Sequence, residues 1–200
     1  TQMNSESLSA KLILASSSKY RKMLLHRFNI PYDCHAPGVD ESKEVNESPV
    51  DLVNRLACEK AAIVSKENPG AIVIGSDQIA VFEDRAIGKP GDHPTAKKQL
   101  IAFSGNSIEF HTAVAVQCLV TGFSELHTDS TRVRFRDLQE DEIERYLVAE
   151  TPYNCAGAFK AESLGITLFE SIKTDDPTAL VGLPLIHTAA MLRRAGLCLP

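Results

Sequence analysis

The hydrophobic positions in the first half of the chain predict strands that alternate with helices. Short, fully apolar runs are typical of buried strands, and apolar residues spaced three or four apart indicate helices. Proline near the start of a segment and glycine just after it mark where a helix begins and ends. The sequence therefore predicts strands over 11–15, 32–35, 71–74 and 79–82, and helices from 19 onward, over 48–68 and over 94–103.

The second half of the chain predicts a long hairpin followed by two more helices. Residues 108–120 and 124–135 have the pattern of its two strands, about a turn at Thr121-Gly122. Asp137 and Glu140 have the spacing of a capping box, which predicts a helix after them. A strand over 166–172 and a last helix over 184–195 follow. This order of elements favours an α/β fold with a mixed sheet.

The composition is that of a globular protein. Of the 200 residues, 44% are hydrophobic and 24% are charged, which is enough to bury a substantial core. We expect a single domain over residues 11–200. Residues 1–10 carry no apolar periodicity, and we expect a flexible N-terminus or a cloning remnant there.

Charge, hydropathy and cysteine usage exclude several classes of protein. A net charge of -5 argues against binding to nucleic acid, and no apolar stretch is long enough to span a membrane. The N-terminus has no signal-peptide core, so we expect a cytoplasmic location. The five scattered cysteines contain no C-x-x-C pair, and the six histidines have no H-E-x-x-H spacing. Neither set predicts a metal site.

Loops next to predicted strands and helices hold the polar residues best suited to chemistry. Ligands in open α/β sheets bind beyond the carboxyl ends of the strands. Ser16, Ser17 and Ser18 precede a helix, and Arg21 adds a planar fork that matches phosphate oxygens. A serine helix cap with solvated basic residues explains the same segment without any ligand.

Two carboxylates and two lysines extend this charge pattern. Asp77 follows an apolar strand and Glu41 lies in a loop, and either could be a metal ligand or a general base. Taken singly, Lys60 and Lys89 are ordinary surface lysines. Together, carboxylates for a divalent ion and cations for phosphates meet the needs of polyphosphate hydrolysis. No Walker-A pattern occurs, which argues against a P-loop ATPase or kinase.

Six segments, in order, resemble the Maf family of nucleoside triphosphate pyrophosphatases. They are LILASSSKYRKMLL, Asp40-Glu41, Glu59-Lys60-Ala61, IGSDQ, Gly88-Lys89-Pro90 and Val181-Gly182-Leu183-Pro184-Leu185. The resemblance spans about residues 11–195. It implies a cytoplasmic, metal-dependent enzyme, often a homodimer, that converts a nucleoside triphosphate to a monophosphate and pyrophosphate. It also implies a mixed, twisted sheet flanked by helices, with two lobes around a cleft as in the inosine triphosphate pyrophosphatases (the Maf/Ham1 fold).

The resemblance also assigns roles to individual residues. It makes Asp77 the proton acceptor and places Glu41 with Asp77 at a divalent ion, which is Mg, Mn or Co. It places five residues around the triphosphate, without deciding which serine contacts a phosphate: Ser16, Ser18, Arg21, Lys60 and Lys89. Water oriented by Asp77 is then expected to attack the α-phosphorus, while the cations stabilise the charge that develops.

Three departures resemble one branch of that family. The branch that acts on dTTP and UTP has Pro-Arg-Arg after the serines, a Thr after the catalytic Asp, and a Lys and a Gln in the last loop of the site. This chain has Lys19-Tyr20-Arg21, Gln78, and then Cys155 and Glu162. These substitutions resemble the branch that hydrolyses 7-methyl-GTP.

The chemistry of the methylated base makes these departures intelligible. N7-methylguanine is cationic, so the face of Tyr20 is expected to attract it. Glu162 is expected to accept hydrogen bonds from the guanine edge, and Gln78 to add an amide contact. Singly, each residue also fits a structural role: a Tyr packed on its own helix, a Gln in a turn and a solvated Glu.

Other functions stay open from the sequence. The main alternatives are a dTTP/UTP pyrophosphatase of the same family and a non-catalytic, nucleotide-binding regulator of cell division. The presence of both Glu41 and Asp77 argues against a pure binder, which needs cations but no water-orienting carboxylate. A phosphatase that releases orthophosphate uses similar charges, so the identity of the product distinguishes it.

Overall fold

The computed structural model describes residues 10–200. Apart from Ala10, the segment expected to be flexible or a cloning remnant lies outside the described residues. No helix within 10–200 combines the length and the apolar character needed to cross a bilayer.

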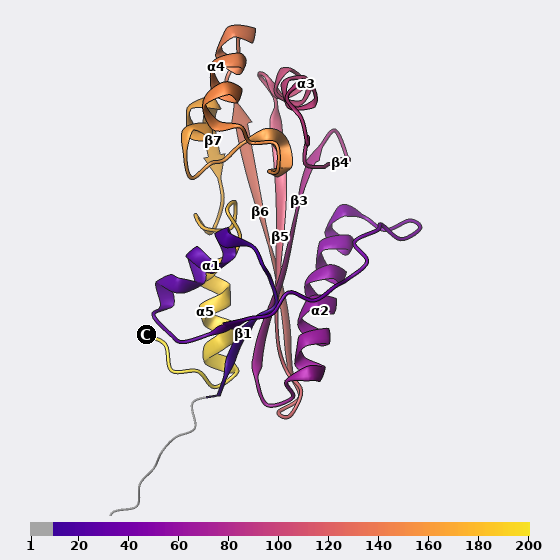
Figure 1. The fold of residues 1–200 in the computed structure, drawn as a ribbon, viewed down its shortest axis with the longest axis vertical. Helices are drawn as coiled ribbons and strands as arrows, with labels where there is room; N and C mark the ends of the chain where they lie inside the picture. The colour runs from indigo at the N-terminus through magenta and orange to yellow at the C-terminus, as the bar shows by residue number, and fades with distance from the viewer. Residues whose placement is uncertain (1–9) are drawn as a thin grey trace, which may run out of the picture.

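One mixed, twisted sheet runs through the molecule (Figure 1). Its strands lie in the order β2-β1-β3-β5-β6-β7, and β4 also pairs with β3. β1 is parallel to β2 and β3, and the other pairs are antiparallel. The strands are β1 (Leu12–Leu14), β2 (Asp33–Cys34), β3 (Ile72–Phe82), β4 (Arg85–Ile87), β5 (Ser107–Cys118), β6 (Phe123–Phe135) and β7 (Phe169–Lys173).

Helices cover both faces of one half of this sheet. α2 (Pro49–Glu67) packs on one face, while α1 (Lys19–Leu25) and α5 (Leu185–Arg194) lie on the other (Figure 1). Successive strand residues point to opposite faces, so Val73 joins the core under α2, whereas Ile72 and Ile74 join the core under α5. These two cores form the first lobe.

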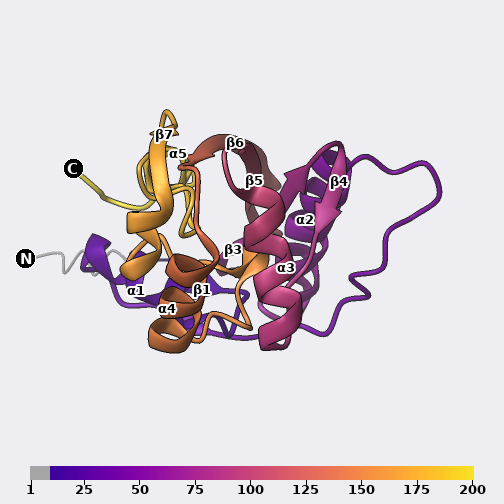
Figure 2. The ribbon, with the colours of Figure 1, turned by 90° about the horizontal axis from the view of Figure 1, so that it is seen from above.

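The second lobe surrounds the far ends of β3, β5 and β6. It contains α3 (His93–Phe103), α4 (Glu140–Glu150) and β7, which gather at the top of Figure 1; Figure 2 looks down on the molecule from this end. Its core contains Phe103, Phe135 and Phe159, and the partly buried Phe169 packs against them; most of these ring pairs meet edge to face. The three longest strands run through both lobes. The predicted mixed sheet with flanking helices and two lobes is confirmed.

The prediction of two separate strands over 71–74 and 79–82 is wrong. Both segments belong to β3, and Gly75, Ser76, Asp77 and Gln78 lie within it. All four pair in register with β5, from Gly75 with Ala115 to Gln78 with Thr112. These residues interrupt the apolar pattern of the sequence, but the backbone stays extended through them.

Two other local predictions shift by a few residues. The capping box of α4 is formed by Gln139 and Glu142, not by Asp137 and Glu140. The strand predicted over 166–172 begins only at Phe169, because residues 164–168 form a 3-10 helix. Both errors concern the ends of elements, where the final hydrogen bonds depend on tertiary packing.

Gly75 allows β3 to lie directly against α2. A Cβ atom at this position would be 2.2 Å from the carbonyl oxygen of Ala57 and 2.7 Å from the amide nitrogen of Ala61. Both obstacles are backbone atoms of α2, which a rotamer change cannot move. This close approach fixes the distance between α2, which carries Lys60, and β3, which carries Asp77.

Replacing Gly75 with Ala should destabilise the protein by about 3 kcal/mol, because the added methyl group must push a helix away from the sheet. Denaturant unfolding of the Gly75→Ala variant measures this loss. Gly70→Ala is the matched control, since nothing lies within 4 Å of a Cβ atom there. Equal stability of the two variants would contradict the role given to Gly75.

Candidate active site

The candidate site lies at a gap beside β3. On one side of this strand, β1 pairs with residues 72–74 and β4 pairs with residues 80–82. Within the described part of the chain, residues 75–79 have no partner strand on that side. The chain enters this gap from both ends. Ser16–Ser18 follow β1, which is parallel to β3, and Gly88-Lys89 follow β4, which is antiparallel to β3. A cavity of about 750 Å³ opens here.

The gap explains why neighbouring strand residues reach the same cavity. Asp77 and Gln78 point to opposite faces of β3, with Asp77 toward α2 and Gln78 toward Thr112. In a continuous sheet the neighbouring strand would separate them. Because that strand is missing at residues 75–79, both side chains line one cavity.

Five charged residues from separate segments line this cavity together. They are Arg21, Glu41, Lys60, Asp77 and Lys89. The arrangement on which the charge argument depends, two acids among three bases, is therefore present in the fold. Their individual catalytic and binding roles remain predictions.

Lys60 links the two acidic groups. Its Nζ atom lies 2.8 Å from Oδ1 of Asp77 and 2.9 Å from Oε1 of Glu41. The lysine is 8% exposed, so it is not the ordinary surface lysine that its sequence context suggests. α2 places it there because the apolar side of the helix packs on the sheet, and Lys60 lies beside that side, next to Ala61.

The charges of this cluster affect one another. The hydrogen bond from Lys60 lowers the pKa of Glu41 below its ordinary value, against the opposing effect of burial, and Lys89 and Arg21 lower it further. Burial lowers the pKa of Arg21, while Asp77 and Glu41 act in the opposite direction. A guanidinium stays protonated under such conditions, so the site holds a fixed positive charge.

The serine loop is shaped by its own hydrogen bonds. Ser18 caps α1 and accepts a bond from the amide of Arg21, as the structural interpretation of this segment predicts. Ser16 is 7% exposed, and its Oγ atom accepts bonds from the amide of Ser18 and from Nη1 of Arg21 at 3.3 Å. Ser16 thus holds the guanidinium of Arg21 at the cavity wall, and each hydroxyl keeps a proton to donate.

The three residues predicted to recognise the base also line the cavity. Tyr20 lies near Cys155 and Glu162, and burial together with these neighbours raises the pKa of Tyr20 to about 12. Lys19 places its Nζ atom 5.1 Å from the centre of the Tyr20 ring, so one face of the ring already attracts a cation. Burial also raises the pKa of Cys155, which keeps its thiol neutral.

The amide group of Gln78 is oriented by the protein. Its Nε2 atom donates to the carbonyl oxygens of Leu180 and Ala179, at 2.8 and 3.2 Å, and lies 2.9 Å from Oγ1 of Thr112. The nitrogen is therefore fully used. What Gln78 can offer to a ligand is its carbonyl oxygen, an acceptor.

The apolar part of the cavity wall is not predicted from the sequence. Phe110, Phe159, Leu180 and Val181 line it, and three of them also belong to the core of the second lobe. Their only signal in the sequence is hydrophobicity, which core residues share. Such a wall suits the flat surface of a base or a sugar.

Comparison with known proteins places the chain in a family. The model of the family described as "Maf-like protein" matches residues 11–195.

This chain belongs to the Maf-like family.

Related proteins of this Maf-like chain carry a common name. A protein of Albidiferax ferrireducens is 51% identical over 96% of this chain and 97% of its own length, and one of Aromatoleum aromaticum is 51% identical over 96% and 98%. Both are named "7-methyl-GTP pyrophosphatase". A solved HAM1 protein from Coxiella burnetii has a TM-score of 0.51 at 13% identity, covering 92% of this chain and 99% of its own, which shows a shared fold.

Replacing Lys60 with Met should raise the pKa of Glu41 toward its ordinary value, because the hydrogen bond is the main cause of the lowering. Because the pKa of Glu41 is lower in the folded state than in the unfolded state, its ionised carboxylate stabilises the folded protein at pH values above the unfolded-state pKa. This contribution to the free energy of unfolding is lost as the pH falls through the folded-state pKa. NMR titration of the glutamate carboxyl groups measures the change. Glu47 is the internal control, because Arg55 is what lowers its pKa. An unchanged Glu41 would contradict the assignment.

Proposed function

We propose that this Maf-like protein is a 7-methyl-GTP pyrophosphatase, which hydrolyses its substrate to 7-methyl-GMP and pyrophosphate. The observation that carries the proposal is the contact of Lys60 with both Glu41 and Asp77 in a cavity that Arg21 and Lys89 also line. The names of relatives with half of their residues identical over nearly the whole chain support the same substrate.

The phosphates bind among the cations. Arg21 offers a planar pair of donors, and Lys60 and Lys89 offer single ammonium groups, from three different segments of the cavity wall. Ser16 and Ser18 can add hydroxyl donors at the end of β1. Positive charge fixed before the substrate arrives stabilises the additional negative charge of the transition state.

Asp77 acts on the attacking water. Its Oδ1 atom is held by Lys60, which fixes the carboxylate in the cavity while Oδ2 is left to accept a proton. The water attacks the α-phosphorus, its oxygen forms the new P–O bond, and the bond to the bridging oxygen of pyrophosphate breaks. Asp77 takes up the proton that the water loses.

The oxygen donors of Glu41 and Asp77 fit a divalent cation. Both carboxylates belong to the same cluster through Lys60, and hard ions such as Mg²⁺ prefer one or two carboxylates together with phosphate oxygens and water. When bound, Mg, Mn or Co would neutralise charge on the leaving pyrophosphate. Glu41 lies on an exposed loop, so its carboxylate can leave Lys60 and bind the ion instead.

The base lies against Tyr20, Gln78 and Glu162. A ring face that already attracts Lys19 suits the cationic N7-methylguanine. Glu162 and the carbonyl oxygen of Gln78 are both acceptors, which match the adjacent N–H donors of the guanine edge. Thymine and uracil are neutral, and their hydrogen-bonding edge differs from that of guanine. These three side chains therefore favour 7-methyl-GTP over dTTP and UTP.

We further expect the chain to act as one domain over residues 11–200, as a cytoplasmic homodimer, on a free nucleotide. The alternative of a nucleotide-binding regulator of cell division predicts binding without release of pyrophosphate, which the measurement below distinguishes.

Replacing Asp77 with Asn should lower turnover by about 1000-fold, because the amide cannot accept the proton from water. Release of pyrophosphate from 7-methyl-GTP with Mg²⁺ or Mn²⁺ measures the effect, and circular dichroism checks that the fold is intact. Near-parental turnover would refute the role of Asp77. Release of orthophosphate instead of pyrophosphate would refute attack at the α-phosphorus.

The wild-type protein should hydrolyse 7-methyl-GTP faster than GTP, dTTP or UTP at equal concentration. The Glu162→Gln variant should lose most of this selectivity while retaining its stability, because the exposed side chain loses charge but keeps its shape. The ratios of kcat/KM measure the effect. Glu150→Gln is a matched control, since that carboxylate bonds Ser163 and Leu164. Wild-type preference for dTTP or UTP would overturn the assigned substrate, and unchanged selectivity of Glu162→Gln would overturn the base contact.

A further inference from the structure

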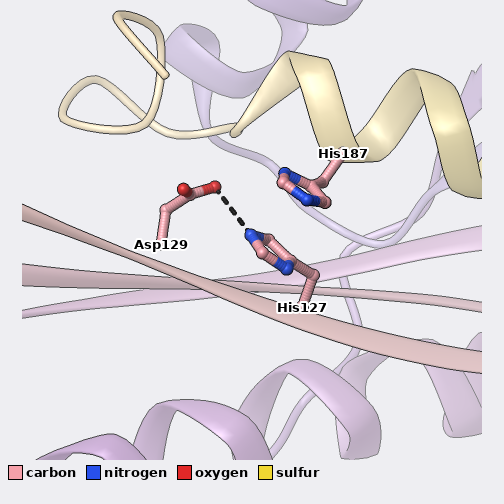
Figure 3. A group of neighbouring side chains, drawn as sticks. All are labelled: His127, Asp129 and His187. Carbon is pink, nitrogen blue, oxygen red and sulfur yellow. Dashed lines mark hydrogen bonds and ion pairs between the residues drawn. The ribbon is translucent and has the colours of Figure 1, made fainter. Parts of the chain in front are cut away.

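A second cluster of chemically active side chains lies between β6 and α5. His127 and Asp129 project from β6 toward His187 on α5 (Figure 3). Each residue offers one ligand atom, and these atoms all lie within 4.8 Å of one another. The spacing of the histidines in the sequence is unlike a metal motif, yet the fold brings together two of them that are 60 positions apart.

None of the three residues lines the candidate active site. The register pairs His127 with Val114 and Asp129 with Thr112, which puts both on the α5 face of the sheet. The main acidic pair, Glu41 and Asp77, belongs to the gap beside β3. The two clusters are therefore distinct, and they also differ in chemistry: one offers only oxygen donors, the other mainly imidazole nitrogen.

The cluster buries polar groups that its own contacts do not satisfy. Asp129 is 6% exposed, and the only hydrogen bond found for its carboxylate within the described residues joins Oδ2 to Nε2 of His127 at 3.1 Å. The Nδ1 atom of His187 is buried and has no hydrogen-bond partner among these residues. Buried polar groups are normally paired, because each unpaired one costs about 1–3 kcal/mol. The buried Nδ1 atom of His187 is therefore a ligand atom that no protein group uses, and the carboxylate of Asp129 keeps an oxygen for which no hydrogen bond is found within the described residues.

The charges around the cluster favour a cation as that partner. Asp176 lies near enough to repel the charge of Asp129, and its own oxygens are already bonded to Thr178 and to the amide of Ile186. The rings of His127 and His187 stack with their centres 3.4 Å apart. The stacking keeps both imidazoles beside the carboxylate of Asp129.

We propose that His127, Asp129 and His187 form a binding site for a divalent transition-metal ion such as zinc. Two imidazoles and a carboxylate are ligands that zinc commonly uses, with a fourth position left for water. The 3.1 Å between Nε2 of His127 and Oδ2 of Asp129 is close to the edge of about 3.3 Å between two ligands in tetrahedral zinc geometry. A rotation of the stacked His187 ring completes the set, since its ligand atom is already within 4.8 Å.

A metal here would fasten α5 to the edge of the sheet. β7 pairs with β6 only from Arg132 onward, so His127 and Asp129 lie on the part of β6 where α5 packs alongside the sheet. The loop over 176–184 leads directly into α5, and its Leu180 and Val181 line the candidate active site. The ion would link α5, which follows this loop directly, to β6.

The test uses purified full-length protein without an affinity tag, stripped with a chelator, equilibrated with ZnCl2 and dialysed. We expect about one zinc per chain in the wild type and a raised Tm on adding zinc. His187→Ala and Asp129→Asn should bind zinc more than about 100-fold more weakly, because changing a residue that only supports a metal ligand already costs about 10–100-fold in affinity and changing the ligand itself costs more. Because Glu41 and Asp77 could also hold Co²⁺, the difference in visible absorption between the Co²⁺-loaded wild type and Co²⁺-loaded His187→Ala is measured, and it should report nitrogen and oxygen ligands in tetrahedral geometry.

Two controls identify the site of binding. His26→Ala removes an exposed histidine, and Asp77→Asn alters the candidate active site, so both should retain zinc as the wild type does. Circular dichroism checks that His187→Ala and Asp129→Asn remain folded. Zinc that stays bound in His187→Ala, or a wild type that retains no zinc and gains no stability from it, would overturn the proposal. Neither result would alter the activity proposed above, since the two sites share no residue.

Discussion

The site depends on one buried ammonium group held between two carboxylates. Lys60 on α2 contacts Asp77 on β3 and Glu41 on the loop before α2. Burying one of these charges alone would cost several kcal/mol, and together they compensate one another. The contact requires α2 to lie unusually close to β3, and Gly75 makes this approach sterically allowed. Backbone packing and site electrostatics are thus two consequences of the same geometry.

An interruption in the sheet gives this cluster a cavity to face. β1 and β4 cover the ends of one side of β3 and leave its middle without a neighbour among the described strands. Any strand placed there would bury Asp77 and separate it from Gln78. The exposed edge therefore gives space for a ligand and also gives access to side chains of both faces. β5 pairs along the opposite side from Val73 to Val81 and keeps β3 straight across the gap.

The two lobes contribute different chemistry to the cavity. The first lobe supplies the serine loop, Arg21, Lys60 and Glu41, which are suited to phosphate and a hard cation. The second supplies apolar and aromatic side chains such as Phe110 and Phe159, which are suited to a base. β3, β5 and β6 pass through both, so the relative position of the two sets is fixed by continuous hydrogen-bonded strands. The histidine cluster on β6 uses the same strands for a different purpose, at the contact with α5.

The sequence by itself determined the local elements and the set of reactive residues. The 11–15 run, the helix after Pro49 and the hairpin about Thr121-Gly122 all follow from local patterns of hydrophobicity and turn residues, and the ordered Maf-like motifs pointed to Asp77, Lys60 and their neighbours. Only the tertiary structure decided that β3 is unbroken through Asp77, that Lys60 is buried, and that His127 meets His187. Local patterns describe what each segment can form alone, whereas burial, strand gaps and contacts between distant residues arise only when the segments pack together.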